Sequence, residues 1–374
     1  MQADVFCRVV DNYGDIGVTW RLVRQLQHEH QWSIRLWVDD LKSFQRLEAR
    51  VDCQASQQMI EHVEIVHWAK PAPDLMPRSV VLSSFSCDLP DAYIARLHQT
   101  PATWINLEYL SAEAWVEGCH GLPSLRGDGL SSHFFFPGFN ARTGGLLREH
   151  DLLTHRDAWQ KDLPAQHQML KRLGVSKEAL QAWQQADSVQ ARLLSLFCYP
   201  HAPLEQLLEA LAQDTRPSIL LVPDGVAPAL LTGRQGPSDH VYIERIPFVS
   251  QSEYDQLLWM ADLNFVRGED SIVRALWSGK PLIWQIYPQT EGTHLIKLEA
   301  WLKISGLPKN IQALISQWNA DAVSADLLEG FEEALSDKAY AQWSTHAQAL
   351  SHTLAQETDF AQALHNFCIS KQTP

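Results

Sequence analysis

One stretch in the second half of the chain decides the fold, and it reads Phe265-Val266-Arg267-Gly268-Glu269-Asp270-Ser271-Ile272-Val273-Arg274-Ala275-Leu276-Trp277-Ser278-Gly279-Lys280-Pro281. It predicts the end of a buried strand, from Asp262 to Val266, followed by a tight turn and a short helix. Asp270 or Ser271 is a candidate N-cap, since a side-chain oxygen there accepts an otherwise unpaired N–H of the first turn. Gly279 followed by Pro281 is typical of a helix end.

A second apolar strand, from Leu282 to Tyr287, follows this helix at once. A strand–helix–strand unit of this kind is typical of a parallel sheet. Ligands bind at the carboxyl edge of such sheets, and a helix N-terminus there favours an anion. The stretch therefore predicts a site for a phosphate-bearing ligand, although an ordinary strand–turn–helix without a ligand explains the same residues.

Strand and helix patterns also alternate through the rest of the chain, as in α/β proteins with helices on both faces of a parallel sheet. The alternation begins with a strand from Val5 to Val10 and a helix from about Val18 to His30. It lapses between His120 and Leu146, where glycines and prolines predict long connections, and it restarts with a strand from Arg192 to Phe197. We therefore expect two Rossmann-like domains that face each other across a cleft.

The domain boundaries follow from where the alternation stops and restarts. We expect a first domain over residues 1–187 and a second over residues 188–350. Residues 351–374 are expected to form a C-terminal helix that packs back on the first domain. The length of 374 residues agrees with two domains, because single hydrophobic cores rarely grow so large.

The composition excludes several classes of protein. The formal net charge of −14 argues against a nucleic-acid partner, because binding to phosphates needs concentrated Lys and Arg. No signal peptide is expected, since Asp4, Arg8 and Asp11 interrupt the first apolar run. No uncharged run approaches the roughly 18 residues that a membrane helix needs. We expect a cytoplasmic protein that binds neither nucleic acid nor membrane.

Metal-binding patterns are weak in this sequence. The six cysteines are scattered without a C-x-x-C pair, as in a reduced cytosolic protein that has no zinc site. His28-Glu29-His30 lies at a polar helix end and lacks a third ligand. Asp39-Asp40 follows a strand and is most simply explained as a helix cap. We expect no bound metal.

The loop after the first strand carries a second candidate site, Asp11-Asn12-Tyr13-Gly14-Asp15-Ile16-Gly17. Its glycines allow a ligand to approach the backbone closely, but the pattern is not the G-x-G-x-x-G fingerprint of a nicotinamide cofactor site. A carboxylate in a cleft is suited to act as a general base, which makes Asp11 and Asp15 candidates. Alternatively, Asp15 caps the following helix and Asp11 forms an Asx-turn.

Glu269 and Asp270 complicate the predicted phosphate site, because carboxylates repel a diphosphate. A carboxylate is useful beside a nucleotide-sugar if it accepts hydrogen bonds from hydroxyls while backbone N–H groups face the phosphates. Arg267 or Arg274 can offset the negative charge. The same half of the chain contains side chains that can stack on a base or form a hydrogen bond with its edge, namely Tyr199, Phe248, Gln251 and Tyr287. Each of them is equally suited to the core or to the surface.

Several long motifs occur in an order that is specific to one family. In the first half they are Phe6-Cys7-Arg8-Val9-Val10-Asp11-Asn12-Tyr13-Gly14-Asp15-Ile16-Gly17 with Trp20-Arg21-Leu22, Leu36-Trp37-Val38-Asp39-Asp40-Leu41, Glu108-Tyr109-Leu110-Ser111-Ala112-Glu113 and Gly144-Gly145-Leu146-Leu147-Arg148-Glu149. In the second half they are Ile246-Pro247-Phe248-Val249, Asp255-Gln256-Leu257-Leu258, Arg267-Gly268-Glu269-Asp270-Ser271 and Tyr287-Pro288-Gln289. With these motifs the chain resembles the bacterial protein-arginine rhamnosyltransferases that modify elongation factor P, the EarP family. The resemblance extends to about Trp301 and is weak over residues 45–80 and 150–190.

This resemblance implies a GT-B glycosyltransferase fold, with the acceptor side in the first domain and the nucleotide-sugar in the second. The family transfers rhamnose from dTDP-β-L-rhamnose to a guanidinium nitrogen of one arginine in elongation factor P, and so activates that translation factor. It inverts the anomeric centre and uses neither a metal nor another cofactor. The implied partners are therefore elongation factor P and dTDP-β-L-rhamnose.

The family pattern also implies roles for individual residues. Asp15 is the catalytic carboxylate, and Glu269 is counted with it from the donor side. The loop that supports Asp15 comprises Asp11, Asn12, Tyr13 and Gly14. The implied donor-binding residues are Tyr199, Phe248, Gln251, Arg267, Gly268, Asp270, Ser271 and Tyr287, of which Tyr199 is the least secure match. Two alternatives stay open: a GT-B enzyme that uses another nucleotide-sugar on a small-molecule or carbohydrate acceptor, and a non-catalytic binding protein of the same fold.

Overall fold

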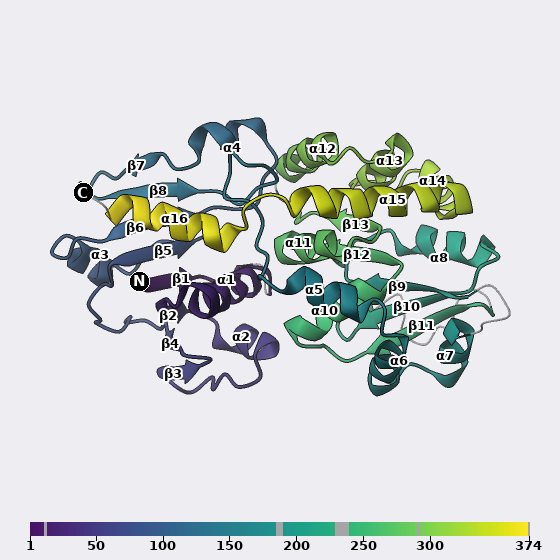
Figure 1. The fold of residues 1–374 in the computed structure, drawn as a ribbon, viewed down its shortest axis with the longest axis horizontal. Helices are drawn as coiled ribbons and strands as arrows, with labels where there is room; N and C mark the ends of the chain where they lie inside the picture. The colour runs from purple at the N-terminus through teal and green to yellow at the C-terminus, as the bar shows by residue number, and fades with distance from the viewer. Residues whose placement is uncertain (11–12, 185–189, 229–238, 290–291, 373–374) are drawn as a thin grey trace. The chain divides into compact units, whose positions relative to one another are not determined.

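The computed structural model describes residues 1–10, 13–184, 190–228, 239–289 and 292–372 of the chain (Figure 1). The chain divides into two compact units. The first unit comprises Met1–His150 and Leu354–Pro374, and the second comprises Asp151–Thr353. None of the helices in the described ranges is long and apolar enough to cross a membrane.

The first unit is built on a mostly parallel sheet. Its described strands lie side by side in the order β3 (Gln57–Ile60), β4 (Val63–His67), β2 (Ser33–Val38), β1 (Gln2–Cys7), β5 (Val80–Ser84), β6 (Thr103–Leu107), β8 (Ser131–Phe135) and β7 (Pro123–Leu125). The edge strands β3 and β7 run antiparallel to their neighbours, and the other pairs are parallel. The chain runs outward from β1 to β2 and β4, then returns to β5 beside β1. This reversal creates a topological switch point at the carboxyl ends of β1 and β5.

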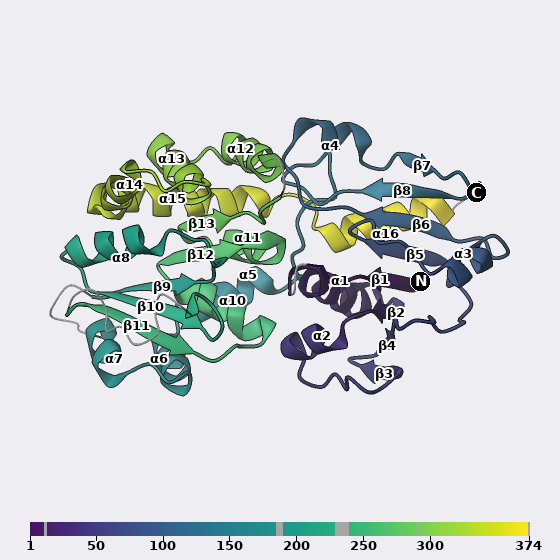
Figure 2. The same cartoon turned by 180° about the vertical axis from the view of Figure 1, so that it is seen from behind.

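Helices cover both faces of this sheet, and β1 shows why. Alternate residues of a strand point to opposite faces. Val5 and Cys7 belong to a core shared with α1 and α16, whereas Phe6 packs in a second core with Tyr93 of α3. The last helix, α16, packs along α1 (Figure 2). The described helices of this unit are α1 (Gly14–His30), α2 (Leu41–Leu47), α3 (Asp91–Leu97), α4 (Ala114–Cys119) and α16 (Phe360–Gln372).

The segment between His120 and Leu146, for which long connections were expected, contains two further strands, β7 and β8. β8 extends the parallel part of the sheet, with Phe134 opposite Asn106 and Phe135 opposite Leu107 of β6. Strands of three and five residues between glycines and prolines are too short for a clear period-2 pattern, so the sequence alone did not reveal them.

The second unit has an entirely parallel sheet in its described residues. The strands lie in the order β11 (Val241–Ile246), β10 (Ser218–Pro223), β9 (Arg192–Leu196), β12 (Leu263–Arg267) and β13 (Leu282–Gln285). The chain runs outward from β9 to β10 and β11, then crosses back to β12 on the other side of β9. The switch point of this unit therefore lies at the carboxyl ends of β9 and β12.

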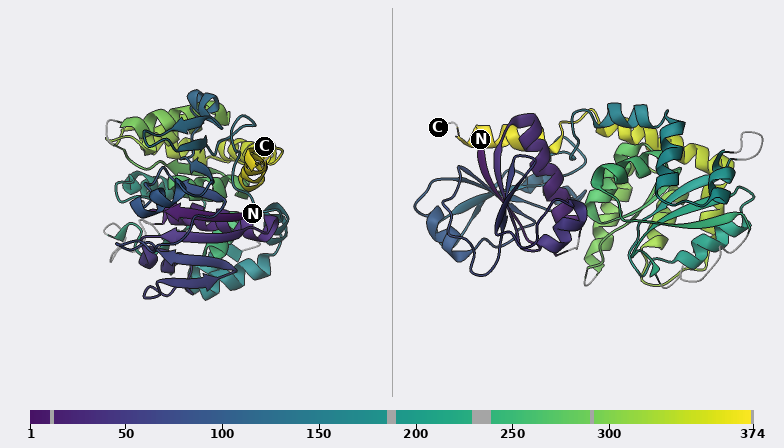
Figure 3. Two further views of the ribbon diagram at one scale, coloured as in Figure 1. Left: turned by 90° about the vertical axis from the view of Figure 1, so that its left-hand side faces the viewer. Right: turned by 90° about the horizontal axis from the view of Figure 1, so that it is seen from below.

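The strands of the second unit lie between helices (Figure 3). α8 packs with α14 and α13 packs on β13, while α10 contacts β9 and α11. The described helices are α5 (Leu152–Trp159), α6 (Leu163–Arg172), α7 (Lys177–Gln184), α8 (Leu204–Gln213), α10 (Gln251–Met260), α11 (Gly268–Ser278), α12 (Thr293–Ser305), α13 (Lys309–Trp318), α14 (Asp326–Leu335) and α15 (Asp337–Leu354).

The second unit begins at Asp151 rather than at the expected residue 188. The difference arises from α5, α6 and α7, which precede the first strand of this unit. Leu170 and Trp183 of these helices share a core with Leu193 of β9 and Ile219 of β10. An amphipathic pattern shows that a helix has a buried face, but it does not show which of two sheets buries that face.

The stretch from Phe265 to Pro281 forms β12 and α11, as predicted, but the N-cap prediction is wrong. The helix begins at Gly268, its N-cap is Arg267, and no side chain caps it. The Ser271 hydroxyl instead donates to the carbonyl oxygen of Arg267. Gly268 explains the early start, because its φ of +66° lets the strand turn directly into the helix. The predicted C-terminus is confirmed, since Gly279 is the left-handed C-cap.

Gly145 lies where the C-terminal segment returns to the first unit, and its replacement tests that contact. Its φ is +74°, and an added Cβ would lie 2.2 Å from the carbonyl oxygen of Thr358. We expect Gly145→Ala to lower the free energy of unfolding by about 2–3 kcal/mol, measured by urea denaturation, because left-handed strain and a backbone clash add. Gly174→Ala is the matched control, since Gly174 has a φ of +87° but no atom within 4 Å of the added Cβ. An equal loss in both variants would contradict the clash.

Candidate active site

The switch point of the second unit gathers predicted donor residues from different strands. Arg267 ends β12, and its Nη1 donates to the carbonyl oxygen of Cys198, which follows β9, at 3.0 Å. The guanidinium group lies 4.3 Å from the ring centroid of Phe197 and 4.8 Å from that of Tyr199. Tyr287, after β13, meets Tyr199 edge to face at 5.7 Å. The structure thus brings together Tyr199, Arg267 and Tyr287 at the place where α/β sheets bind ligands.

Gln285 supports this cluster, and no sequence pattern had marked it. Its side chain is almost fully buried at the end of β13, and its Oε1 accepts a hydrogen bond of 2.7 Å from the backbone N–H of Tyr199. Its Nε2 is a buried donor without a partner among the described residues. The neighbouring Trp284 donates from Nε1 to the carbonyl oxygen of Gly268 at 2.8 Å, which fixes the start of α11. The sequence signal that could have identified Gln285 is a polar residue at the end of an otherwise apolar strand.

The first turn of α11 contains Glu269 and Asp270, the two carboxylates whose charge opposes phosphate binding. Both side chains are half-buried. Carboxylates near a helix N-terminus are stabilised by the helix dipole, so their presence needs no ligand. Beneath this turn, burial raises the pKa of Tyr254, and the charge of Asp270 adds to the rise.

Arg274, a residue considered for offsetting these charges, forms a buried ion pair one turn further along α11. Its Nε lies 3.0 Å from Oδ1 of Asp255 and its Nη2 lies 2.7 Å from Oδ2. The side chains are 2% and 6% exposed. Because Asp255 belongs to α10, the pair fixes α11 against α10 and so positions the helix that carries Glu269 and Asp270.

Phe248 and Gln251 lie in the connection between β11 and α10 and at the first residue of α10. Both follow β11, which is two strands away from β9, and Gln251 is the first residue of α10. Ser250 caps this helix in a capping box with Glu253. Phe248 is half-buried and Gln251 is buried. α10 also contacts β9, and its Tyr254 meets Phe197 at 5.8 Å, so the assignment of Phe248 and Gln251 to the donor site stays a prediction.

Asp15 lies at the switch point of the first unit, in the first turn of α1. It is 4% exposed, and its Oδ2 accepts a hydrogen bond of 2.8 Å from the N–H of Val10. Its carbonyl oxygen accepts from Oγ1 of Thr19 at 2.8 Å, and that hydroxyl also lies 3.3 Å from Oγ of Ser84, the last residue of β5. The carboxylate is thus held by the loop after β1, and the backbone of Asp15 is linked through Thr19 to the end of β5.

The alternative role of Asp15 as a helix cap is wrong. α1 begins at Gly14 rather than near Val18, and its N-cap is Tyr13, which makes no side-chain cap. The carboxylate bonds back to the loop, so its orientation is set by the end of β1. Burial raises the pKa of the Cys7 thiol at that strand end, and the charge of Asp15 adds to the rise.

The structure describes some of the other residues of this loop. Asp11 and Asn12 lie outside the described residues. The hydroxyl of Tyr13 accepts from Nη1 of Arg46 at 3.0 Å. Asp39 supports the loop, since its Oδ1 accepts from the N–H of Val9 at 2.9 Å. The predicted cap is confirmed for Asp40, which accepts from the backbone N–H groups of Lys42 and Ser43 at the start of α2.

A strained turn adjoins this switch point, and the sequence patterns missed it. Phe85 and Ser86, directly after β5, have φ values of +56° and +52°, which are unusual for residues other than glycine. The ring of Phe85 stacks on Tyr109 at 4.7 Å, and Oγ of Ser86 donates to Oε1 of Glu108 at 2.8 Å. Strained residues of this kind concentrate at functional sites.

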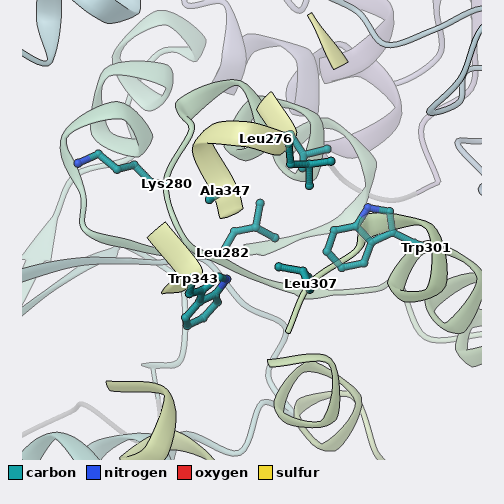
Figure 4. A pocket seen from close by; sticks show the side chains of 8 residues that line it. Leu276, Lys280, Leu282, Trp301, Leu307, Trp343 and Ala347 are labelled. Atoms are coloured by element: carbon teal, nitrogen blue, oxygen red, sulfur yellow. The ribbon is translucent and has the colours of Figure 1, made fainter. Parts of the chain in front are cut away.

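A cavity in the second unit has a different character (Figure 4). It lies behind α11 and holds about 10 Å³, the space of one water molecule. Its lining residues are Leu276, Lys280, Leu282, Trp301, Leu307, Trp343, Ala347 and Leu350. The Lys280 side chain extends away from the other labelled side chains. The cavity is a packing gap and too small for a nucleotide.

The described residues contain no group of three or more His, Cys, Asp or Glu side chains placed to hold a metal ion. Each unit therefore contains its own candidate group: the first unit has a buried carboxylate, and the second has an arginine–aromatic cluster beside a helix N-terminus. A carboxylate can orient and deprotonate a nucleophile, and a helix N-terminus with an adjacent guanidinium favours a phosphate.

Comparisons with known proteins agree with this arrangement. Residues 3–369 match the family described as "Elongation-Factor P (EF-P) rhamnosyltransferase EarP". The protein-arginine rhamnosyltransferase of Pseudomonas aeruginosa is 43% identical over 97% of this chain and 98% of its own length. A solved structure that explains EarP-mediated arginine glycosylation of translation elongation factor EF-P is 32% identical, with a TM-score of 0.65 over 99% of both chains. Acinetobacter baumannii MurG, at 11% identity, a TM-score of 0.52 and coverage of 100% of this chain and 99% of its own, shares the fold alone. The chain has the GT-B glycosyltransferase fold and belongs to the EarP family of elongation factor P rhamnosyltransferases.

Proposed function

We propose that this chain is an inverting glycosyltransferase that moves rhamnose from dTDP-β-L-rhamnose to an arginine guanidinium nitrogen of elongation factor P. The observation that carries the proposal is membership of the EarP family along residues 3–369. Asp15 in the first unit and the Tyr199–Arg267 cluster in the second supply the chemical groups that such a reaction needs. A cytoplasmic location follows from the acceptor, which is a translation factor.

Inversion requires a single displacement in which the acceptor and the leaving group lie on opposite faces of the sugar. Arginine is a poor nucleophile, because its guanidinium group stays protonated at neutral pH. Asp15 cannot remove that proton in advance, since the two pKa values differ by roughly 8 or more. We therefore propose that Asp15 orients the guanidinium group and accepts its proton as the C–N bond forms, when that nitrogen becomes more acidic.

The leaving diphosphate needs positive potential on the donor side. The backbone N–H groups at the start of α11 and the guanidinium group of Arg267 are the candidates, and both lie at the switch point. Tyr199 and Tyr287 offer aromatic surface to the donor, while Glu269 accepts hydrogen bonds from its hydroxyl groups. This arrangement accounts for a metal-independent reaction, which is what we propose.

Mass spectrometry tests the proposed function directly. The protein is mixed with dTDP-β-L-rhamnose and elongation factor P, with and without a metal chelator, and the acceptor is weighed and fragmented. We expect one added deoxyhexose on an arginine in both samples. An unmodified acceptor would contradict the proposal, and modification only without the chelator would contradict metal independence. A variant acceptor with lysine in place of the modified arginine is the control.

Glu269→Ala is expected to weaken the binding of dTDP-β-L-rhamnose about 10- to 150-fold. The half-buried carboxylate would no longer accept hydrogen bonds from the donor, and a lost charge-assisted hydrogen bond corresponds to about 1.5–3 kcal/mol. Isothermal titration calorimetry measures the affinity. Glu205→Ala is the matched control, because Glu205 is likewise an acid in the first turn of a helix, α8. Unchanged affinity in Glu269→Ala would remove this residue from the donor site.

A further inference from the structure

His201 lies next to the Tyr199 cluster, and neither the sequence motifs nor the proposed reaction has used it. It belongs to the loop that leaves β9 at the switch point and leads into α8. Its imidazole ring is parallel to the ring of Tyr199, with an interplanar angle of 4° and a centroid separation of 6.0 Å. Tyr199 is buried, whereas His201 is exposed. The imidazole is therefore accessible to a ligand that occupies this edge of the sheet.

A second histidine, His294, comes from a different element and interacts electrostatically with His201. It is buried in the first turn of α12, and its Nδ1 accepts a hydrogen bond of 3.2 Å from the N–H of Gln289. Because Nδ1 is the acceptor, the neutral ring carries its proton on Nε2. This hydrogen bond fixes the tautomer of His294. The hydrogen bonds described for the structure include none to the imidazole of His201.

The surroundings of His201 disfavour its protonated form. Partial burial of the ring lowers the pKa of His201, His294 lowers it further, and Asp321 raises it. The other titratable groups of the cluster are Tyr199, Tyr287 and the guanidinium group of Arg267, which lies over the ring of Tyr199. A bound anion would reverse this balance, because negative charge favours the imidazolium form.

We propose, on the basis of the proposed function, that His201 is a further donor-site residue whose imidazolium form binds the diphosphate of the nucleotide-sugar. When the bond between C1 of the sugar and the diphosphate oxygen breaks, both electrons stay on that oxygen and the diphosphate gains one negative charge. His201 supplies positive charge and an N–H donor for this product. The site would then bind a proton together with the donor and would hold that proton until the nucleoside diphosphate leaves.

Thermodynamic linkage gives the sign of the pH effect. The pKa of His201 is lowered in the empty protein and rises when the anion binds. Protonated protein therefore binds the donor more tightly, and the affinity falls as the pH rises through the pKa of the complex. The diphosphate of dTDP-β-L-rhamnose is doubly esterified and has no terminal phosphate group to titrate near neutral pH, so a pH dependence reports the protein.

Calorimetry at pH 6 and pH 8 tests the inference, with dTDP-β-L-rhamnose and, as a phosphate-free probe, thymidine. We expect the donor to bind wild-type protein about three- to fivefold more tightly at pH 6 than at pH 8, because a rise of about one in the pKa of His201 on binding gives tenfold only as its upper limit. His201→Gln should reduce this ratio below about twofold, and His201→Lys should bind tightly at both pH values, because lysine keeps its charge. His155→Gln, at an exposed histidine of α5, should behave like wild type.

The outcomes separate this inference from the proposed function. Donor binding that is equally tight at both pH values, or a pH ratio that persists in His201→Gln, would overturn the role of His201 and leave the donor assignment intact. A pH ratio of the same size with thymidine would also overturn it, since thymidine has no phosphate. Absence of binding by dTDP-β-L-rhamnose at either pH would overturn the donor assignment, and this inference with it.

Discussion

Asp15→Asn is expected to lower the turnover of rhamnosyl transfer by about 10²- to 10⁴-fold, the range that removal of a general base produces. The affinity for dTDP-β-L-rhamnose should change less than about twofold, because the residues proposed to bind the donor belong to the other unit. Asparagine keeps a carbonyl oxygen that accepts the hydrogen bond from Val10, so the loop should retain its conformation. It cannot accept the proton that the guanidinium group loses as the C–N bond forms.

Single-turnover kinetics with elongation factor P and mass spectrometric readout measure the chemical step, and calorimetry measures donor binding. Asp39→Asn is the matched control, because Asp39 also accepts a backbone hydrogen bond from the same loop, from Val9 at 2.9 Å. A similar loss in both variants would show that the loop, rather than the carboxylate, limits the reaction. Wild-type turnover in Asp15→Asn would exclude Asp15 as the proton acceptor.

Local patterns predicted the elements of the second unit well where the chain is strongly periodic. The strand before Arg267, the helix after it and the left-handed C-cap at Gly279 all follow from residues that are neighbours in sequence. The start of α11 was misplaced because Asp270 and Ser271 are typical cap residues, and only the φ of Gly268 shows that the helix begins earlier.

The contacts that build the candidate site depend on strand order, which local patterns do not contain. Gln285 bonds to the backbone of Tyr199, 86 residues earlier, because the strand order brings β13 within one strand of β9. Arg267 reaches Cys198 because its strand, β12, pairs directly with β9. The family resemblance pointed to Tyr199 and Arg267 as residues of one site, but it contained no signal for Gln285 or His201. The strand order is what places Gln285 beside Tyr199 and His201 at the switch point.

Arg274→Leu is expected to lower the free energy of unfolding by about 3–5 kcal/mol, because it leaves the buried carboxylate of Asp255 without its cation. This loss is a large share of the roughly 5–15 kcal/mol that stabilises a typical domain. Urea denaturation followed by tryptophan fluorescence measures it. Donor binding should weaken as well, since the pair fixes α11, which carries Glu269, against α10.

The double variant Arg274→Leu with Asp255→Leu distinguishes loss of a pair from loss of a charge. Buried ion pairs are often replaced by apolar residues at little cost, so the double variant should recover most of the lost stability. Arg172→Leu is the control for an exposed pair, since Arg172 lies 2.7 Å from Glu253 with side chains that are 57% and 28% exposed. It should change the free energy of unfolding by less than about 1 kcal/mol.

The outcomes distinguish two roles of the ion pair. If the double variant recovers stability but not donor affinity, the ion pair positions the donor site. If it recovers both, apolar packing between α10 and α11 is sufficient for that position. A loss in Arg274→Leu no larger than that in Arg172→Leu would contradict the buried pair altogether.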